Sequence, residues 1–206
     1  GKAGILIELS AQTGKPLWKL PVGVHRGPGD AGLLTENATP ASPIPLPAEF
    51  SLEPGVFGGV ESQLATNGSA TFAAVNNLAV PLTVKGVTES SQAFRAAIPR
   101  ATGEMIAVNQ DTGKVEWDDH LPSSPYGAAA VTNNVVFTTT YSGHLYAFNA
   151  ATGAILLNRP LSAGSNAPVT IDGDYVITGA AVPLSGQALI IAYKLGATGK
   201  LPHTVR

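Results

Sequence analysis

The chain has 206 residues, of which 44% are hydrophobic and 13% charged, with a formal net charge of −2 and no cysteine. This composition indicates an ordered globular protein and gives no electrostatic basis for binding nucleic acid or an anionic membrane. It also excludes disulfides and thiolate metal sites. No apolar run approaches the roughly 18 residues that a membrane-spanning helix needs.

A short motif recurs along the chain: an apolar strand, a Thr-Gly turn, and a tryptophan five residues after the threonine. The clearest copy is Met105–Trp117, and the other copies end at Trp18, Leu157 and His203. Thr112 and Thr152 are 40 residues apart, and Thr152 and Thr198 are 46 apart. This period predicts a repeat architecture with one four-stranded blade per repeat.

Each repeat also predicts a hairpin before the Thr-Gly motif. The expected turns are Asn67-Gly68, Asn133-Asn134 and Asp172-Gly173, each between short runs rich in β-branched, aromatic or small residues. Asn, Asp and Gly accept the positive φ that tight hairpin turns require. Small residues in the first strand of each hairpin suit a crowded position near a central axis.

These signals divide one domain into five parts. In chain order we expect outer strands of a partial blade (residues 1–18), a Pro-rich loop insertion without regular structure (19–56), an expanded blade (57–119), a regular blade (126–160) and a terminal blade (166–206). Within the expanded blade, residues 90–97 could form a short helix or a mobile loop. Because the chain starts inside a predicted strand, we expect a mature or truncated piece.

The pattern A-x-[ND]-x-x-T-G-x-x-x-W in Ala107–Trp117 resembles the repeat of the PQQ-like, or quinoprotein, β-propeller family. In that family the tryptophan docks one blade on the next, which implies docking roles for Trp18 and Trp117. Leu157 and His203 depart from the pattern, so their docking contacts should be weaker or differently built. The resemblance implies an all-β propeller segment of about three and a half four-stranded blades from a ring of seven or eight.

A partial ring leaves open blade edges. Missing blades of the same protein, a second chain, or a second copy of this chain could cover them. Low charge and abundant Thr, Asn, Gly and Ala favour an extracytoplasmic location, that is periplasmic, cell-surface or secreted.

Dehydrogenases of the family, as the resemblance implies, hold PQQ beside a calcium ion bound by acidic and amide oxygens. Glu61 is the one acidic residue on a predicted innermost strand, and Asn166 lies at the start of the equivalent strand two blades later, so the two could pair in this way. Glu61 could equally cap a turn or line a wet channel. The vicinal cysteine pair of many such enzymes cannot exist here, and both tryptophans are committed to docking. We therefore assign no catalytic and no metal-binding residue.

The sequence thus predicts a non-catalytic scaffold that binds a ligand or protein on its axial face, without a cofactor. The candidate residues of that face are His25, Arg26, Glu61, Asn76, Asn77, Tyr126 and Asn166. His25, Arg26 and Asp30 could instead belong to a solvated loop, and Asp118-Asp119-His120 is interpreted as a charged turn at an outer edge. The alternatives are a fragment of a PQQ- and calcium-dependent alcohol or sugar dehydrogenase, or a structural subunit of a surface assembly.

Overall fold

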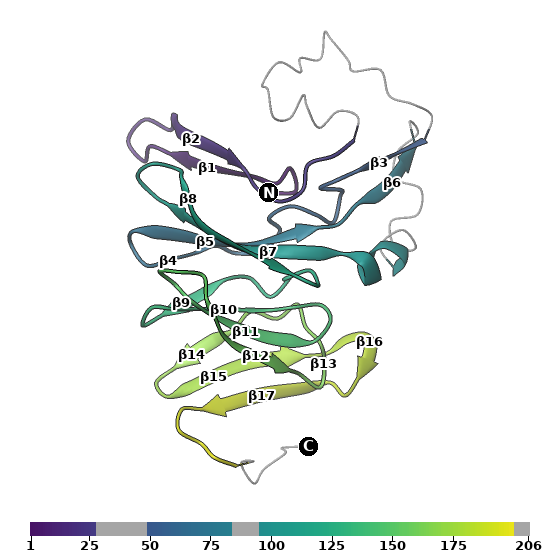
Figure 1. The fold of residues 1–206 in the computed structure, drawn as a ribbon, viewed down its shortest axis with the longest axis vertical. Coiled ribbons are helices and arrows are strands. Elements are labelled where there is room, and N and C mark those ends of the chain that lie inside the picture. Colours follow the sequence, from purple (N-terminus) through teal and green to yellow (C-terminus); the bar gives the residue numbers. More distant parts are fainter. Residues whose placement is uncertain (28–48, 84–94, 200–206) are drawn as a thin grey trace.

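The computed structural model describes residues 1–27, 49–83 and 95–199, which are built almost wholly from antiparallel strands (Figure 1). Small sheets follow one another along the long axis in sequence order, so the β1–β2 sheet and the β14-β15-β17 sheet lie at opposite ends of the stack (Figure 1). This is the arrangement of consecutive blades that the repeats predict. Among the described residues, no helix is long and apolar enough to cross a membrane.

The first sheet is a hairpin of two strands, β1 (Ile5–Leu9) and β2 (Pro16–Pro21). Its turn shows why the Thr-Gly motif recurs. Gly14 has φ +69° and donates its N–H to the Ser10 carbonyl, while the Ser10 hydroxyl accepts from the Thr13 N–H. Glycine is the residue that adopts this left-handed conformation without a steric penalty.

The second sheet has four strands in the order β4-β5-β7-β8. They are β4 (Ala65–Thr66), β5 (Ala70–Asn77), β7 (Thr102–Asn109) and β8 (Val115–Leu121). The β7–β8 turn repeats the geometry of the first, with Gly113 at φ +67° and the Asn109 side chain accepting from the Thr112 N–H. The Asn or Asp of the motif therefore caps the turn.

The third sheet also has four strands, and the fourth has three. They are β9 (Ala130–Thr132), β10 (Val135–Thr139), β11 (His144–Asn149) and β12 (Ile155–Pro160), followed by β14 (Thr170–Asp172), β15 (Tyr175–Ala180) and β17 (Leu189–Lys194). The predicted hairpin turns are confirmed, because Asn133 and Asn134 both have positive φ between β9 and β10, and Gly173 does between β14 and β15. After β17 the positive-φ glycine is Gly196 and not the predicted Gly199. His203 lies outside the described residues.

Two further strand pairs and a short 3-10 helix lie beside the sheets. They are β3 (Glu49–Leu52) with β6 (Val80–Thr83), β13 (Ala163–Gly164) with β16 (Val182–Gly186), and η1 (Ile98–Arg100). The expectation that residues 19–56 hold no regular element is therefore wrong at residues 19–21, which end β2, and at β3. The clustered prolines precede Glu49, and the four residues of β3 contain none, so their N–H groups are free to pair.

The inner strand of the second sheet begins later than predicted. The hairpin pattern predicts this strand in the run of small residues 57–61, before the Asn67-Gly68 turn. Residues 57–61 contribute only an isolated bridge between Gly59 and Asn76, and the strand itself is β4. Gly59 has φ +76°, and a Cβ there would lie 2.7 Å from the carbonyl oxygens of Gly1 and Lys2. The segment is thus pressed against the N-terminal residues and bends out of the sheet.

Three apolar clusters fill the spaces between consecutive sheets. Leu6 and Val75 belong to the cluster between the first and second sheets, Phe72 and Phe148 to the next, and Phe137 and Val169 to the last. Strand residues alternate between the two faces of a sheet, so each inner sheet contributes to two clusters. The outward faces at the ends of the stack carry exposed apolar side chains, with Leu9 55% exposed on β1 and Ile190 87% exposed on β17.

Candidate functional site

The two tryptophans of the repeat each contact the following sheet in the same way. Trp18 on β2 donates its Nε1–H to the Gln110 carbonyl at 2.8 Å, and Trp117 on β8 donates to the Ala150 carbonyl at 2.8 Å. Both acceptors lie two residues before a Thr-Gly turn. The indole rings lie against the turn glycines, since a Cβ on Gly113 or Gly153 would fall within 2.7 or 2.9 Å of ring atoms. The same motif therefore supplies both the tryptophan that docks and, in the next repeat, the Thr-Gly turn on which it docks.

The contact between the third and fourth sheets is built differently. Leu157 occupies the tryptophan position on β12, is 37% exposed and belongs to none of the apolar clusters of the described residues. A cation–π contact is found nearby, where the Arg159 guanidinium lies 5.0 Å from the centre of the Tyr193 ring on β17. Apolar packing of Phe137, Leu145 and Val169 completes this interface.

Glu61 and Tyr126 lie near one another at the inner end of the second and third sheets. The Lys2 Nζ is 3.6 Å from Glu61 Oε1 and donates a hydrogen bond to the Val56 carbonyl at 2.6 Å. Burial raises the pKa of Glu61, and Lys2 opposes that shift. The Tyr126 hydroxyl donates to the Phe57 carbonyl at 2.5 Å, and burial followed by the charge of Glu61 raises the pKa of Tyr126.

Asn76 and Asn77 are buried at the end of β5 and face opposite sides of the sheet. Asn77 accepts from the Val24 N–H at 2.9 Å and donates to Glu104 Oε1 at 2.8 Å, so it joins the segment after β2 to the second sheet. The side-chain oxygen and nitrogen of Asn76 are buried with no hydrogen-bond partner in the described part of the chain. A buried amide without partners calls for a water or ligand beside it.

The remaining candidates lie at the periphery. His25 Nε2 is 3.2 Å from the carbonyl oxygens of Gly4 and Val22, and the Arg26 backbone pairs with Glu53. Asn166 is exposed in the segment before β14. Asp30 lies outside the described residues. Glu61 and Tyr126 lie close enough for the charge of Glu61 to raise the pKa of Tyr126.

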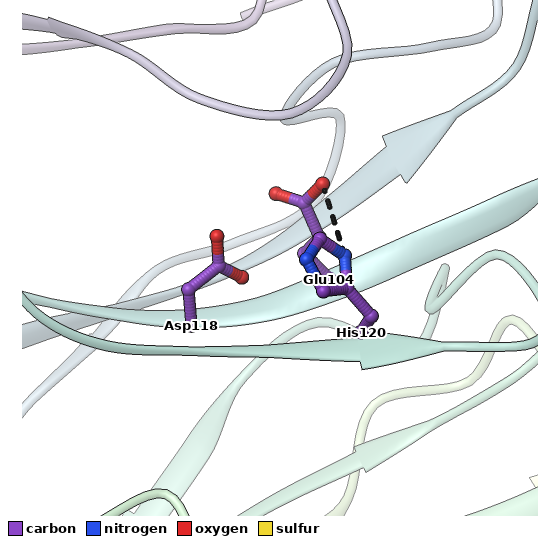
Figure 2. Close-up of side chains that lie close together, drawn as sticks. All are labelled: Glu104, Asp118 and His120. Atoms are coloured by element: carbon purple, nitrogen blue, oxygen red, sulfur yellow. Dashed lines mark ion pairs between the residues drawn. The ribbon is translucent and has the colours of Figure 1, made fainter.

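A second polar group forms on the outer strands, where the sequence predicted only a charged turn. Asp118 and His120 are part of strand β8, which corrects that prediction, and they share one face with Glu104 of β7 (Figure 2). One ligand atom from each of the three lies within 4.8 Å of the others. Sequence reasoning missed the group because Glu104 lies opposite His120 only through the register of β7 and β8.

Comparison with known proteins shows that the chain is similar to one family model and to several solved structures. The family model described as outer membrane protein assembly factor BamB matches residues 101–201. A search of curated proteins gave no match. The quinohemoprotein alcohol dehydrogenase from Comamonas testosteroni is 19% identical with a TM-score of 0.70, over 98% of this chain and 36% of that one.

Two further solved structures are similar over most of this chain. The quinohemoprotein alcohol dehydrogenase ADHIIG from Pseudomonas putida HK5 is 16% identical with a TM-score of 0.65, covering 100% of this chain and 37% of that one. A europium-containing methanol dehydrogenase is 15% identical with a TM-score of 0.62, covering 88% and 35%. At these identities the likeness establishes the fold, and the chain spans roughly a third of each of these proteins.

Proposed function

Because this chain belongs to the PQQ-like β-propeller family, as its repeats predicted, we propose that it is part of a non-catalytic, extracytoplasmic scaffold that binds a ligand or protein on its axial face. One observation carries the proposal: polar side chains near the inner strand ends hold neighbouring segments together. Glu61 pairs with Lys2, Asn77 joins Val24 to Glu104, and Tyr126 bonds to the Phe57 carbonyl. These groups serve the assembly of the blades.

The sheets at the two ends of the stack each expose apolar side chains, and the remaining blades of a propeller ring would cover them. Ile7 and Leu9 on β1 face away from the core at one end, and Ile190 on β17 does so at the other. Removing such apolar surface from water is favourable by about 25 cal/mol per Å². Further blades of the same polypeptide fit both faces best, since the dehydrogenases of similar fold are about three times as long. A second chain or a second copy would satisfy the same requirement.

A dehydrogenase fragment is the second candidate, and Asn76 is the observation that favours it. Its buried, unpartnered amide offers an oxygen of the kind that binds calcium. Against this candidate, Glu61, the acidic residue that the sequence offers as a ligand, already pairs with Lys2.

A reconstitution experiment distinguishes the two functions. The purified protein is titrated with PQQ in the presence and absence of Ca²⁺, while near-ultraviolet absorbance and dye reduction with alcohols or sugars are recorded. The scaffold predicts no saturable PQQ binding and no turnover. Saturable, calcium-dependent binding with turnover that Asn76→Ala abolishes would replace the scaffold by the dehydrogenase.

A further inference from the structure

The Glu104, Asp118 and His120 side chains converge on the face of the second sheet that is directed towards β1 and β2. Glu104 and His120 are direct cross-strand neighbours, and Asp118 lies one pleat further along the same face of β8. Figure 2 shows the two carboxylates and the imidazole directed to the same side of the ribbon. Ile106, which shares this face, belongs to the cluster between the first and second sheets.

Glu104 is the fixed member of the group. Its side chain is only 5% exposed, and its Oε1 accepts from the Asn77 amide at 2.8 Å, which in turn is held by the Val24 N–H. In metal sites, a ligating carboxylate is commonly held in its orientation by a hydrogen bond from a neighbouring group that does not itself bind the metal. The other two members are on the rim, and the His120 side chain is 76% exposed, so both can adjust to an ion.

The charge of this group is poorly balanced in the described residues. Two carboxylates face a single imidazole, whose Nδ1 is 3.5 Å from Glu104 Oε1. Buried carboxylates in proteins are normally paired with cations or bound to metals. A divalent cation would neutralise both carboxylates at once.

We propose that Glu104, Asp118 and His120 bind one divalent transition-metal ion of the Zn²⁺ type. Imidazole nitrogen is a good ligand for zinc and a poor one for Ca²⁺ and Mg²⁺, which take oxygen ligands. Zinc ligands sit about 2.0–2.2 Å from the ion and hence about 3.5 Å from one another. The present ligand atoms lie within 4.8 Å, so small rotations of the exposed Asp118 and His120 close the site.

Such a site has a structural consequence and leaves room for chemistry. The ion would tie β7 to β8 at the outer edge of the sheet and join them, through Asn77, to the segment after β2. Three protein ligands leave one tetrahedral position for water or for a donor atom of another molecule. An ion that binds only the folded state raises its stability by mass action.

Calorimetric titration of the untagged, chelator-treated full protein with Zn²⁺ tests the proposal. We expect one Zn²⁺ ion to bind per protein chain, and the affinity for Ca²⁺ to be at least 100-fold weaker. His120→Ala and Asp118→Asn should each weaken Zn²⁺ binding at least tenfold. Asp119→Asn is the matched control, because Asp119 lies between them on β8 but faces the other way, opposite Met105; its affinity should be unchanged.

Thermal unfolding provides a second reading that does not depend on heats of binding. Zn²⁺ should raise the Tm of the wild type and of Asp119→Asn but not that of His120→Ala, and circular dichroism should show each variant folded. Equal affinity of all variants, preference for Ca²⁺, or loss of binding in Asp119→Asn alone would overturn the assignment.

Discussion

At the scale of single residues, each docking tryptophan depends on a glycine of the next blade. Gly14 and Gly113 occupy the same motif position, at φ +69° and +67°, but only Gly113 supports a tryptophan ring. Replacing either by alanine costs about 1–2 kcal/mol for the left-handed backbone. A Cβ on Gly113 also lies 2.7 Å from Trp18 ring atoms, whereas Gly14 has open space around it.

We therefore expect Gly113→Ala to lower the free energy of unfolding by at least about 1 kcal/mol more than Gly14→Ala, because it displaces a packed ring. Urea unfolding followed by far-ultraviolet circular dichroism measures the difference. Equal losses for the two variants would show that the ring does not rest on the turn.

Trp117 is packed more deeply than Trp18. Its ring lies 5.9 Å from Phe72 and 6.0 Å from Phe148 between centroids, and its indole N–H is buried. Trp117→Ala should therefore cost about 3–5 kcal/mol, as deletion of a buried aromatic side chain does. Trp18→Ala, at a half-buried position, should cost less in the same unfolding assay. The reverse order would contradict the assigned packing.

The raised pKa of Asp118 predicts how stability depends on pH in metal-free protein. Burial and Glu104 raise this pKa above the ordinary 3.8, so the folded state binds the proton more tightly than the unfolded chain. The stabilisation is complete below the ordinary pKa and is lost as the pH rises through the folded pKa. At about pH 7, Asp118→Asn should be more stable than the wild type, and its advantage should shrink towards pH 3.8.

Urea unfolding at a series of pH values in the presence of a chelator checks this prediction. Saturating Zn²⁺ should reverse the order near neutral pH, since the wild type alone keeps the full ligand set. A variant less stable than the wild type in chelator would show that Asp118 acts as a stabilising charge.

At the scale of elements, the hairpins were predictable and the cross-strand polar group was not. The Asn133-Asn134 turn and the Thr-Gly turns can be recognised from the local sequence, because each needs a positive φ that few residues accept. Glu104 and His120 meet only through the register of β7 and β8, including its shift between Ala107 and Val108. In the sequence alone, Asp118 and His120 are interpreted as part of a charged turn. The pairing of β3 with β6 was likewise not predictable, since the two strands lie far apart in the sequence.

The last interface of the stack should be the weakest, because Leu157 replaces the docking tryptophan. The Arg159–Tyr193 contact compensates in part, and exposed cation–π pairs contribute about 0.5–1 kcal/mol. Arg159→Ala should therefore speed amide hydrogen exchange in β17, while β5 and β7 keep their protection. In Arg159→Lys, which retains a cation, the exchange rate of β17 should lie between those of the wild type and Arg159→Ala. Uniform acceleration across all sheets would instead indicate global destabilisation.

At the scale of the whole molecule, the repeat period predicted a stack of similar blades, since a 40-residue unit with two hairpins can bury its faces only by stacking on similar units. The resemblance of the motif to the PQQ-like family identified that stack as part of a propeller. The candidate binding face was less predictable. Tyr126 bonds to the Phe57 carbonyl and Glu61 pairs with Lys2, and in each contact the two partners lie far apart in the sequence. Such contacts arise from packing between sheets and leave no local mark in the sequence.

The measurement that tests the central claim most directly is the native mass of the purified protein by light scattering, with its absorbance spectrum recorded on the same sample. A propeller scaffold with two apolar end faces predicts a particle larger than one 21.0 kDa chain, made of further blades or further chains, without a quinone band. A stable, monodisperse particle of one 21.0 kDa chain would contradict the open faces, and a quinone band would contradict the scaffold.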